Sequence, residues 1–279
     1  MTCNLPRAIA FGALLGAATA AGLGTALADP VSWRSEWPRT DFSRHNVPFA
    51  EIRSGGPPKD GIPSIDAPRF ERMQLGNPTG WSGALGDNEP VIALSIGDDA
   101  RAYPLRVLIW HELANDMVGG TPVAITYCPL CNAALVFERV VNGRVLDFGT
   151  TGKLRHSDLV MYDRQTESRW QQFTGESIVG AMTGQRLRLI PSRLESFGGF
   201  RQRFPEGQIL VPNDPKARNY GRNPYPGTRP VRSLSSMMDR FPMASNRWSA
   251  SWLSKPSQGV TKLGRCRWCG ANAPSAAPI

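Results

Sequence analysis

Residues 126–171, TYCPLCNAALVFERVVNGRVLDFGTTGKLRHSDLVMYDRQTESRWQ, decide which fold the sequence predicts. Short apolar runs separated by turn residues predict strands, at Val123–Tyr127, Ala133–Val140, Val145–Gly149 and Leu159–Tyr162. Asn142-Gly143 is the strongest short hairpin signal in the chain, because both residue types accept the positive φ of a tight turn. Cys128–Asn132 is predicted to form a second turn. The segment therefore predicts a series of short strands that carries a Cys-x-x-Cys turn.

The sequence on either side adds more strands than helices. Further strands are predicted at Pro90–Ile96, Ala100–Pro104, Ser177–Val179, Leu187–Ile190 and Gln208–Val211. Short helices are predicted at Asp66–Met73, Leu105–Asn115 and Ser196–Phe204, the second of them from the helical spacing of its apolar residues. This content predicts a strand-dominated α+β class, with short helices around a mostly antiparallel sheet.

The N-terminus is typical of an export signal. Arg7 gives a basic start, Ala8–Ala28 contains no charge, and Ala26-Leu27-Ala28 fits the small-x-small pattern of a cleavage site. A membrane anchor is the alternative, but the run is rich in Ala and Gly and no basic cluster follows it. We expect cleavage, no stable membrane span afterwards, and a periplasmic or secreted protein in which cysteine pairs persist as disulfides.

Four parts are predicted along the chain: a signal peptide over 1–28, an irregular lead-in over 29–80, a core domain over 81–227 and a tail over 228–279. The formal net charge is +9, and the tail carries +7 of it, with eight Lys and Arg against Asp239 alone. Because the rest of the chain has almost no excess of basic residues, this distribution argues against nucleic-acid binding.

The tail departs from the pattern of the core domain. It has no sustained hydrophobic period and few acidic residues. The codons that can encode Met237-Met238-Asp239 and Pro242-Met243-Ala244 permit Asp-Gly-x-x-Pro-Asp-Gly in a shifted reading frame, which is a typical loop sequence. We expect a single-nucleotide frameshift near Gly227. An authentic, disordered basic extension is the alternative.

Several stretches of the chain resemble one protein family. They are Trp37–His45, Ser54–Pro63, Ala100–Leu105, His111 with Asn115-Asp116, Thr126–Asn132, Phe148–Arg155, Asp158–Ser168, Trp170-Gln171 and Gly175. On these residues the chain from Trp37 to about Gly227 resembles the bacterial domain-of-unknown-function family 3179. The resemblance implies a secreted or periplasmic bacterial protein and implies no reaction. It also implies a further strand-rich stretch after Pro224–Gly227, which fits the expected frameshift.

Cys128 and Cys131 are the leading candidates for chemistry, and three interpretations are open. Their spacing allows a strained, reducible disulfide suited to thiol exchange. It also allows half of a metal site, completed by His111 or an acidic residue. The third interpretation is a structural disulfide or a pair of buried thiols. Cys266 and Cys269 are far away in the sequence and lie in the tail, so we do not expect them to complete a zinc site.

Other candidate residues surround the cysteine pair. The predicted catalytic residues are Cys128, Cys131, His111, Asp163 and Glu167, with the two acids as an acid–base pair. A capping or core role is the alternative for His111, and a turn capped by Asp163 is the alternative for the acids. The predicted binding residues are Lys153, Arg155, Asp158, Arg164 and Gln171, with the arginines as candidate anion clamps.

Two functions of different classes fit these residues. The first is an exported protein with thiol–disulfide redox or metal-assisted chemistry at Cys128, Cys131 and His111, which allows a small-molecule or a redox-protein partner. The second is a non-catalytic module that binds a small ligand or a glycan, with the cysteines as a structural disulfide. The residues do not indicate a particular cofactor, and whether the chain is an enzyme stays open.

Overall fold

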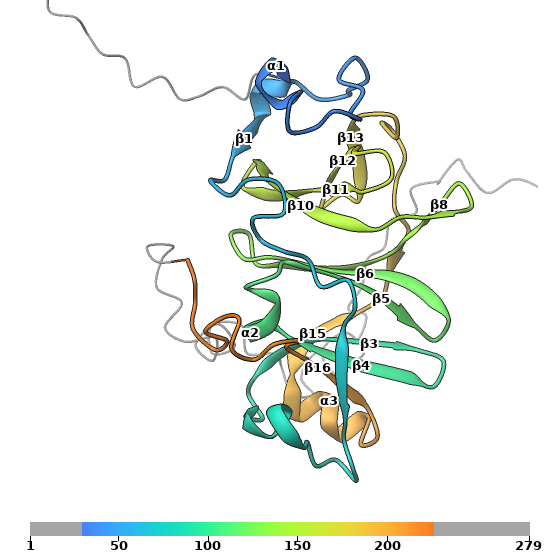
Figure 1. Cartoon of the computed structure of the whole chain (residues 1–279). Helices are drawn as coiled ribbons and strands as arrows, with labels where there is room; N and C mark the ends of the chain where they lie inside the picture. The colour runs from blue at the N-terminus through green and yellow to red at the C-terminus, as the bar shows by residue number, and fades with distance from the viewer. Residues whose placement is uncertain (1–29, 226–279) are drawn as a thin grey trace, which may run out of the picture. The chain divides into compact units, whose positions relative to one another are not determined.

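The computed structural model describes residues 30–225. The expected signal peptide and the tail from residue 228 lie outside this range. Within it the strands form three sheets and one two-stranded ribbon, and the helices are few and short (Figure 1). This arrangement confirms the predicted strand-dominated α+β class. No helix between residues 30 and 225 has the length and apolar composition that crossing a membrane requires.

The first sheet has the strand order β1-β10-β11-β12-β13, with antiparallel neighbours throughout. Its strands are β1 (Ile52–Ser54), β10 (Phe148–Arg155), β11 (Asp158–Asp163), β12 (Arg169–Gln171) and β13 (Glu176–Val179). In the central pair Arg155 lies opposite Asp158, and Phe148 lies opposite Asp163. The two aspartates of the polar segment therefore stand at opposite ends of β11.

The second sheet has the order β14-β7-β6-β5 and is also antiparallel. Its strands are β5 (Leu113–Val118), β6 (Thr121–Cys128), β7 (Ala133–Glu138) and β14 (Leu189–Ile190). Gly119 and Gly120 join β5 to β6 with φ of 51° and 76°, the signs of a tight hairpin turn. A Cβ on Gly119 would lie 2.4 Å from the Ile96 carbonyl oxygen, so this position also requires glycine for space.

The third sheet has the order β15-β3-β4-β16-β2, and only its β16–β4 pair is parallel. Its strands are β2 (Arg69–Arg72), β3 (Pro90–Ile96), β4 (Asp99–Pro104), β15 (Arg193–Ser196) and β16 (Gln208–Val211). The helices are α1 (Pro30–Trp33), α2 (Leu105–Leu108) and α3 (Phe197–Arg203), with single 3₁₀ turns η1 (Phe49–Glu51) and η2 (Gly80–Ala84). The Ser196 hydroxyl caps α3 by accepting the Gly199 N–H at 3.2 Å.

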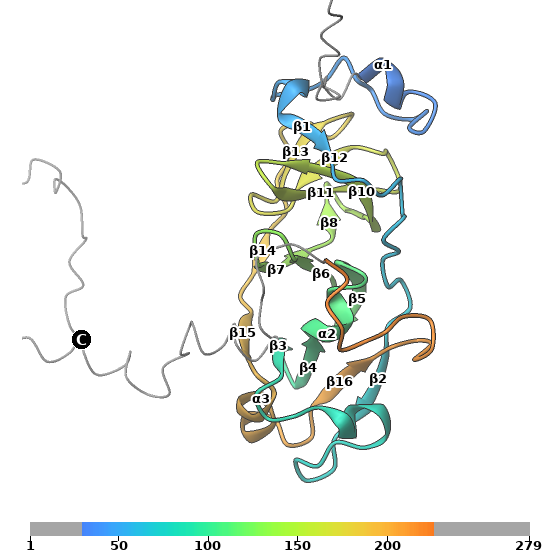
Figure 2. The same ribbon diagram turned by 90° about the vertical axis from the view of Figure 1, so that its left-hand side faces the viewer.

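The three sheets lie in successive layers (Figure 2), and buried apolar side chains join neighbouring sheets. Between the first and second sheets they are Phe148, Met161 and Trp170 packed with Leu113, Ala124 and Phe137. Between the second and third sheets they are Ile125, Tyr127 and Val136 packed with Ile92, Leu94 and Tyr103. Burying a large apolar side chain of this kind contributes about 1.5–3 kcal/mol relative to exposing it. The second sheet is thus covered on both faces, and the cysteine turn lies at one of its ends.

Two predicted helices are wrong. Residues 69–72 of the expected Asp66–Met73 helix form β2, which pairs with β16. The expected Leu105–Asn115 helix ends at Leu108 as α2, and β5 begins at Leu113. Leu113 packs between the first and second sheets, whereas Ala114 packs between the second and third. A strand buried on both faces lacks alternation of apolar and polar residues, so its apolar residues were compatible with a helical period.

The Asn142-Gly143 hairpin is confirmed, with φ of 51° and 73°. Its strands form a separate ribbon, β8 (Val140–Val141) and β9 (Arg144–Val145), instead of extending β7 and β10 as predicted. The pairing of β7 with β6 ends at Arg139. Its N–H donates to the Pro122 carbonyl oxygen of β6 at 2.9 Å, but proline has no N–H to return a bond. The buried Arg139 guanidinium donates to the carbonyl oxygens of Leu146 at 2.8 Å and Asp116 at 3.2 Å, which links the ribbon to β5.

Candidate functional site

The cysteine turn is a four-residue connection between two paired strands. β6 ends at Cys128, β7 begins at Ala133, and these two residues are antiparallel partners. Asn132 adopts φ 52°, a left-handed conformation that Asn accepts more readily than most residues. Its side-chain oxygen accepts a hydrogen bond from the Tyr127 hydroxyl at 3.1 Å. The turn brings Cys128 and Cys131 to the same end of the second sheet.

The two thiols differ in exposure. Both cysteines are free, but the Cys128 side chain is buried and Cys131 is exposed. The Cys128 Sγ lies 3.8 Å from the Ser157 carbonyl oxygen, and the Cys131 Sγ lies 3.9 Å from the Cys128 carbonyl oxygen and 3.6 Å from Asp158 Oδ1, so both S–H groups have acceptors. Interaction with the neighbouring Cys131 side chain is the largest cause that lowers the pKa of Cys128. The same interaction, followed by burial and by the charges of Cys128 and Asp158, raises the pKa of Cys131.

Asp158 completes the group from the first sheet. A two-residue turn with positive φ at His156 (53°) and Ser157 (64°) joins β10 to β11 and delivers Asp158 to the cysteine turn. The Cys131 Sγ lies 3.6 Å from Asp158 Oδ1, and the Phe173 N–H donates to Oδ2 at 2.9 Å. Burial is the largest cause that raises the pKa of Asp158.

The spacing of these three side chains suits a metal ion. The two sulfur atoms and a carboxylate oxygen of Asp158 lie within 4.8 Å of one another, the one such group of three donors within residues 30–225. Bonds of about 2.3 Å to sulfur and about 2.1 Å to oxygen at a tetrahedral zinc place sulfur and oxygen about 3.6 Å apart. The Cys131 and Asp158 atoms have that separation. The group therefore needs little rearrangement to hold a cation.

Further polar side chains lie behind Asp158. The Gln171 side chain lies close enough to the Asp158 carboxylate to lower its pKa, against the larger raising effect of burial. Arg155 donates to Gln171 Oε1 at 2.5 Å and to Glu51 Oε2 at 2.8 Å. Such outer partners fix the orientation of a ligating carboxylate. Arg155 and Gln171 were predicted as binding residues, and the structure places them behind the group, in support of Asp158.

Glu112 is a buried acid beside this group that sequence reasoning missed. Its backbone oxygen accepts the Tyr127 N–H at 2.8 Å, and its carboxylate accepts a hydrogen bond from Tyr225. Burial raises the pKa of Glu112 to about 7. Glu112 has φ 58°, in the link between α2 and β5 where a helix was expected. Because a helix was predicted there, the contact between the Glu112 carbonyl oxygen and Tyr127, the residue before Cys128, was not foreseen.

His111 lies next to Glu112 but is engaged elsewhere. Its Nδ1 lies 2.8 Å from the Pro63 carbonyl oxygen, and its Nε2 lies 2.8 Å from the Tyr220 hydroxyl. Burial lowers the pKa of His111. With both ring nitrogens bonded, His111 stands outside the group formed by the two thiols and Asp158. The structure therefore links His111 to the segment after β16.

The structure does not bring Asp163 and Glu167 to the cysteine turn. Asp163 lies at the far end of β11 from Asp158, about 16 Å away at roughly 3.3 Å per residue of strand. Its carboxylate accepts from the Thr166 N–H at 2.6 Å and the Trp170 indole N–H at 2.9 Å. Glu167 instead pairs with Lys59 at 2.7 Å. The two acids belong to separate networks, which matches the alternative of a turn capped by Asp163.

The remaining predicted residues also lie apart from the thiols. Lys153 is buried with its ammonium 5.8 Å from the centre of the Trp33 ring. Arg164 pairs with Asp66 at 2.7 Å and donates to the Ser64 hydroxyl at 2.8 Å. Both contacts hold the lead-in against the first sheet. The polar segment is thus divided between a group at the cysteine turn and contacts that fasten the lead-in.

Comparison with known proteins identifies the family. The family model described as "Protein of unknown function (DUF3179)" matches residues 59–251. The match covers more than half of the chain, so the chain belongs to this family, and it includes the cysteine turn, Glu112 and Asp158. The match extends beyond Gly227, whereas the family resemblance found in the sequence reaches only to about Gly227. No curated protein and no solved structure matched the chain.

Proposed function

We propose that this member of the DUF3179 family is an exported protein that binds one thiophilic cation, with zinc as the reference ion, through Cys128, Cys131 and Asp158. The convergence of the two sulfur atoms and the carboxylate oxygen within 4.8 Å carries the proposal. Thiolate donors favour Zn²⁺ and Cu⁺ over the hard cations that prefer oxygen ligands alone. The lowered pKa of Cys128 supports it further, because the thiolate is the form of cysteine that binds a metal.

The charges around the thiols favour a cation over a nucleophilic sulfur. Exchange-active cysteines have lowered pKa values in electropositive, accessible surroundings. Here the exposed sulfur is that of Cys131, whose pKa is raised first by interaction with the Cys128 side chain, then by burial and by the charges of Cys128 and Asp158. A bound cation relieves this repulsion and displaces the thiol protons, since metal binding requires deprotonated ligands. The arrangement therefore has the electrostatics of a cation site.

Three protein donors leave a coordination position free. Structural zinc sites have four protein ligands, whereas catalytic ones have three and keep a position for water or substrate. The exposure of Cys131 places the group at the protein surface. A cation held there lowers the pKa of a bound water and polarises a small oxygen-containing substrate. Metal-assisted chemistry on a small molecule is the reaction class that we propose.

Thiol–disulfide exchange is the second candidate, favoured by the lowered pKa of Cys128, for which the neighbouring Cys131 side chain is the largest cause. In that reaction the two thiols lose two electrons and two protons, and a disulfide of a redox-protein partner gains them. The reduction potential separates the alternatives. A value above about −300 mV favours exchange, and a lower value favours a structural disulfide in a binding module.

Metal titration of the reduced protein tests the proposal. The tail cysteines are first replaced, as Cys266→Ser and Cys269→Ser, because they offer a competing pair of thiols. In this background we expect one Zn²⁺ per chain in competition with a chromophoric chelator. Adding Cys131→Ser is expected to weaken binding by at least about tenfold, and the exposed control Asp66→Asn is expected to leave it unchanged. The absence of stoichiometric binding in the background protein would refute the proposal.

Export is supported by the uncharged run that ends at Ala28 and by the small residues before it. The mature protein is then periplasmic or secreted, and its N-terminus is close to Asp29. N-terminal sequencing of the protein recovered from the producing cell tests this. A chain that still begins near Met1 contradicts it.

A further inference from the structure

A pocket of about 170 Å³ lies between the third sheet and the end of α3, on elements other than those of the cysteine turn. Arg193 of β15 is the antiparallel partner of Ala93 on β3, so the two side chains share a face of the sheet. Phe197 and Phe200 of α3 pack on this face with Val91 and Ala93. The small side chain of Ala93 leaves the space that becomes the pocket.

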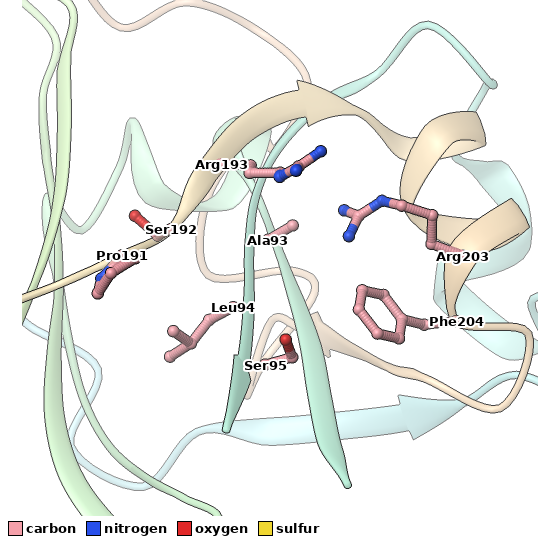
Figure 3. Close-up of a pocket in the computed structure, with 8 residues that line it drawn as sticks. All are labelled: Ala93, Leu94, Ser95, Pro191, Ser192, Arg193, Arg203 and Phe204. Carbon is pink, nitrogen blue, oxygen red and sulfur yellow. The ribbon is translucent and has the colours of Figure 1, made fainter. Parts of the chain in front are cut away.

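The pocket is lined by two arginines that converge. Figure 3 shows the guanidinium groups of Arg193 and Arg203 pointing toward one another across it, with the Phe204 ring below Arg203. Arg203 is held in place by an ion pair with Glu195 and by the Phe204 ring, whose centre lies 4.7 Å from its guanidinium carbon. Within residues 30–225 no carboxylate pairs with Arg193. Arg193, Arg203 and Glu195 together therefore carry one positive charge that no carboxylate in this part of the chain balances.

Like charges that face one another repel unless an anion lies between them. An arginine has five N–H donors, so Arg203 keeps donors for a ligand after it has bonded to Glu195. Two guanidinium groups match the geometry of an oxyanion, which accepts paired N–H donors through adjacent oxygens. Arg193 lies on an edge strand and its side chain is exposed, so a small ion reaches it directly.

We infer that this pocket binds a phosphate-class oxyanion between Arg193 and Arg203, either free phosphate or the phosphate group of a small molecule. The site is independent of the cysteine turn and of the function proposed for it. Ser95, on the same strand face as Ala93, also lines the pocket and offers an exposed hydroxyl donor. Phe204 and Ala93 give an apolar wall for whatever carries the phosphate.

Calorimetric titration of the metal-free full chain with inorganic phosphate tests the inference, with chloride at matched ionic strength as the reference. We expect saturable binding that weakens at least about tenfold in Arg193→Ala, because charge-assisted hydrogen bonds are lost. Arg201→Ala is the matched control, since Arg201 lies on the same helix but pairs with Asp87 outside the pocket. Asp158→Ala is expected to bind phosphate as the unmodified chain does.

Glycerol phosphate, titrated in parallel, identifies the source of the phosphate group. Tighter binding of the ester than of inorganic phosphate assigns a phosphorylated small molecule, and equal binding assigns free phosphate. Non-saturable binding, or an equal loss in Arg193→Ala and Arg201→Ala, would overturn the inference, because it would reflect the general positive charge of the chain. If Arg193→Ala is poorly folded, Arg193→Lys serves instead, with weakened but detectable binding expected because the paired donors are lost.

Discussion

Two aspartates at opposite ends of β11 have opposite surroundings. Asp163 is fully buried, and its carboxylate accepts hydrogen bonds from the Thr166 backbone and hydroxyl and from the Trp170 indole. Asp158 is almost as buried, but one of its oxygens faces the Cys131 thiol, and burial raises its pKa. The difference indicates that Asp163 stabilises the fold, whereas Asp158 is available to a ligand.

The comparison shows how to rank acidic residues that crowd a short segment. Both aspartates lie next to apolar residues in the same strand, and sequence spacing treats them alike. Their positions in the strand decide which of them can bind a ligand. The Thr166 turn and the Trp170 indole occupy the Asp163 carboxylate, whereas the cysteine turn lies next to the Asp158 carboxylate. A buried carboxylate with strong donors on both oxygens is costly to remove, and one that faces thiols is free to change partners.

Replacing the saturated aspartate should produce the largest effect. Asp163→Ala leaves the Thr166 and Trp170 donors without an acceptor in a buried site. We expect the free energy of unfolding to fall by about 4 kcal/mol, since each hydrogen bond to a charged group is worth about 1.5–3 kcal/mol. Urea denaturation measures this loss, and zinc affinity of the folded fraction should be unchanged. A loss below 1 kcal/mol would break the comparison.

Replacing Asp158, the aspartate at the cysteine turn, should have the opposite effect: zinc affinity should fall and stability should change little. Asp158→Ala removes one of three donors, and we expect zinc affinity to fall by about 100-fold, at the upper end of what supporting residues of metal sites cost. The unfolding free energy of the metal-free protein should change little, because a buried carboxylate with a raised pKa is not a strong source of stability. An unaltered zinc affinity would remove Asp158 from the site.

Glu112 extends the comparison to the pH dependence of stability. Burial raises its pKa from the ordinary value of 4.5 to about 7 in the folded chain, so the folded state binds the proton more tightly than the unfolded state. The resulting stabilisation is complete below pH 4.5 and is lost as the pH rises through 7. We expect a loss of about 2 kcal/mol between pH 5 and pH 8. Glu112→Gln, which keeps an acceptor for Tyr225, should flatten this dependence in urea denaturation, and an unchanged slope would exclude Glu112 as its source.

The turn that delivers Asp158 should give the smallest effect. His156 and Ser157 both have positive φ, which Asn-Gly adopts with less strain. The double replacement His156→Asn with Ser157→Gly is expected to raise the unfolding free energy by about 1 kcal/mol. Zinc affinity should stay the same, because β11 keeps its register. A lower thermal midpoint would indicate that the two side chains make contacts that the turn needs.

Most of the strands were predictable from the sequence because their signals are local. The Asn142-Gly143 turn, the strands of the β3–β4 hairpin and the cysteine turn depend on residues next to one another. The predicted helix at Leu105–Asn115 was wrong because Leu113 and Ala114 are buried on opposite faces of β5. A strand that is covered on both faces shows no alternation of apolar and polar residues.

The candidate site was predictable only in part. Cys128 and Cys131 were predicted together from their Cys-x-x-Cys spacing, whereas Asp158, 27 residues after Cys131, was predicted separately as a binding residue. Glu112 was missed, because its position depends on the register of β5 against β6. Distinguishing the role of Asp158 from that of Asp163 likewise requires knowing that they lie at opposite ends of one strand. The spacing of polar residues in the sequence does not reveal this.

X-ray absorption at the zinc edge tests the central claim most directly. The sample is the reduced protein with Cys266→Ser and Cys269→Ser, loaded with one equivalent of Zn²⁺. Coordination by Cys128, Cys131 and Asp158 predicts two sulfur scatterers at about 2.3 Å, with oxygen at about 2.0–2.2 Å from the carboxylate and water. The Asp158→Ala sample should keep both sulfurs and lose one protein oxygen. A spectrum with one sulfur or none, or with oxygen ligands alone, would contradict the account.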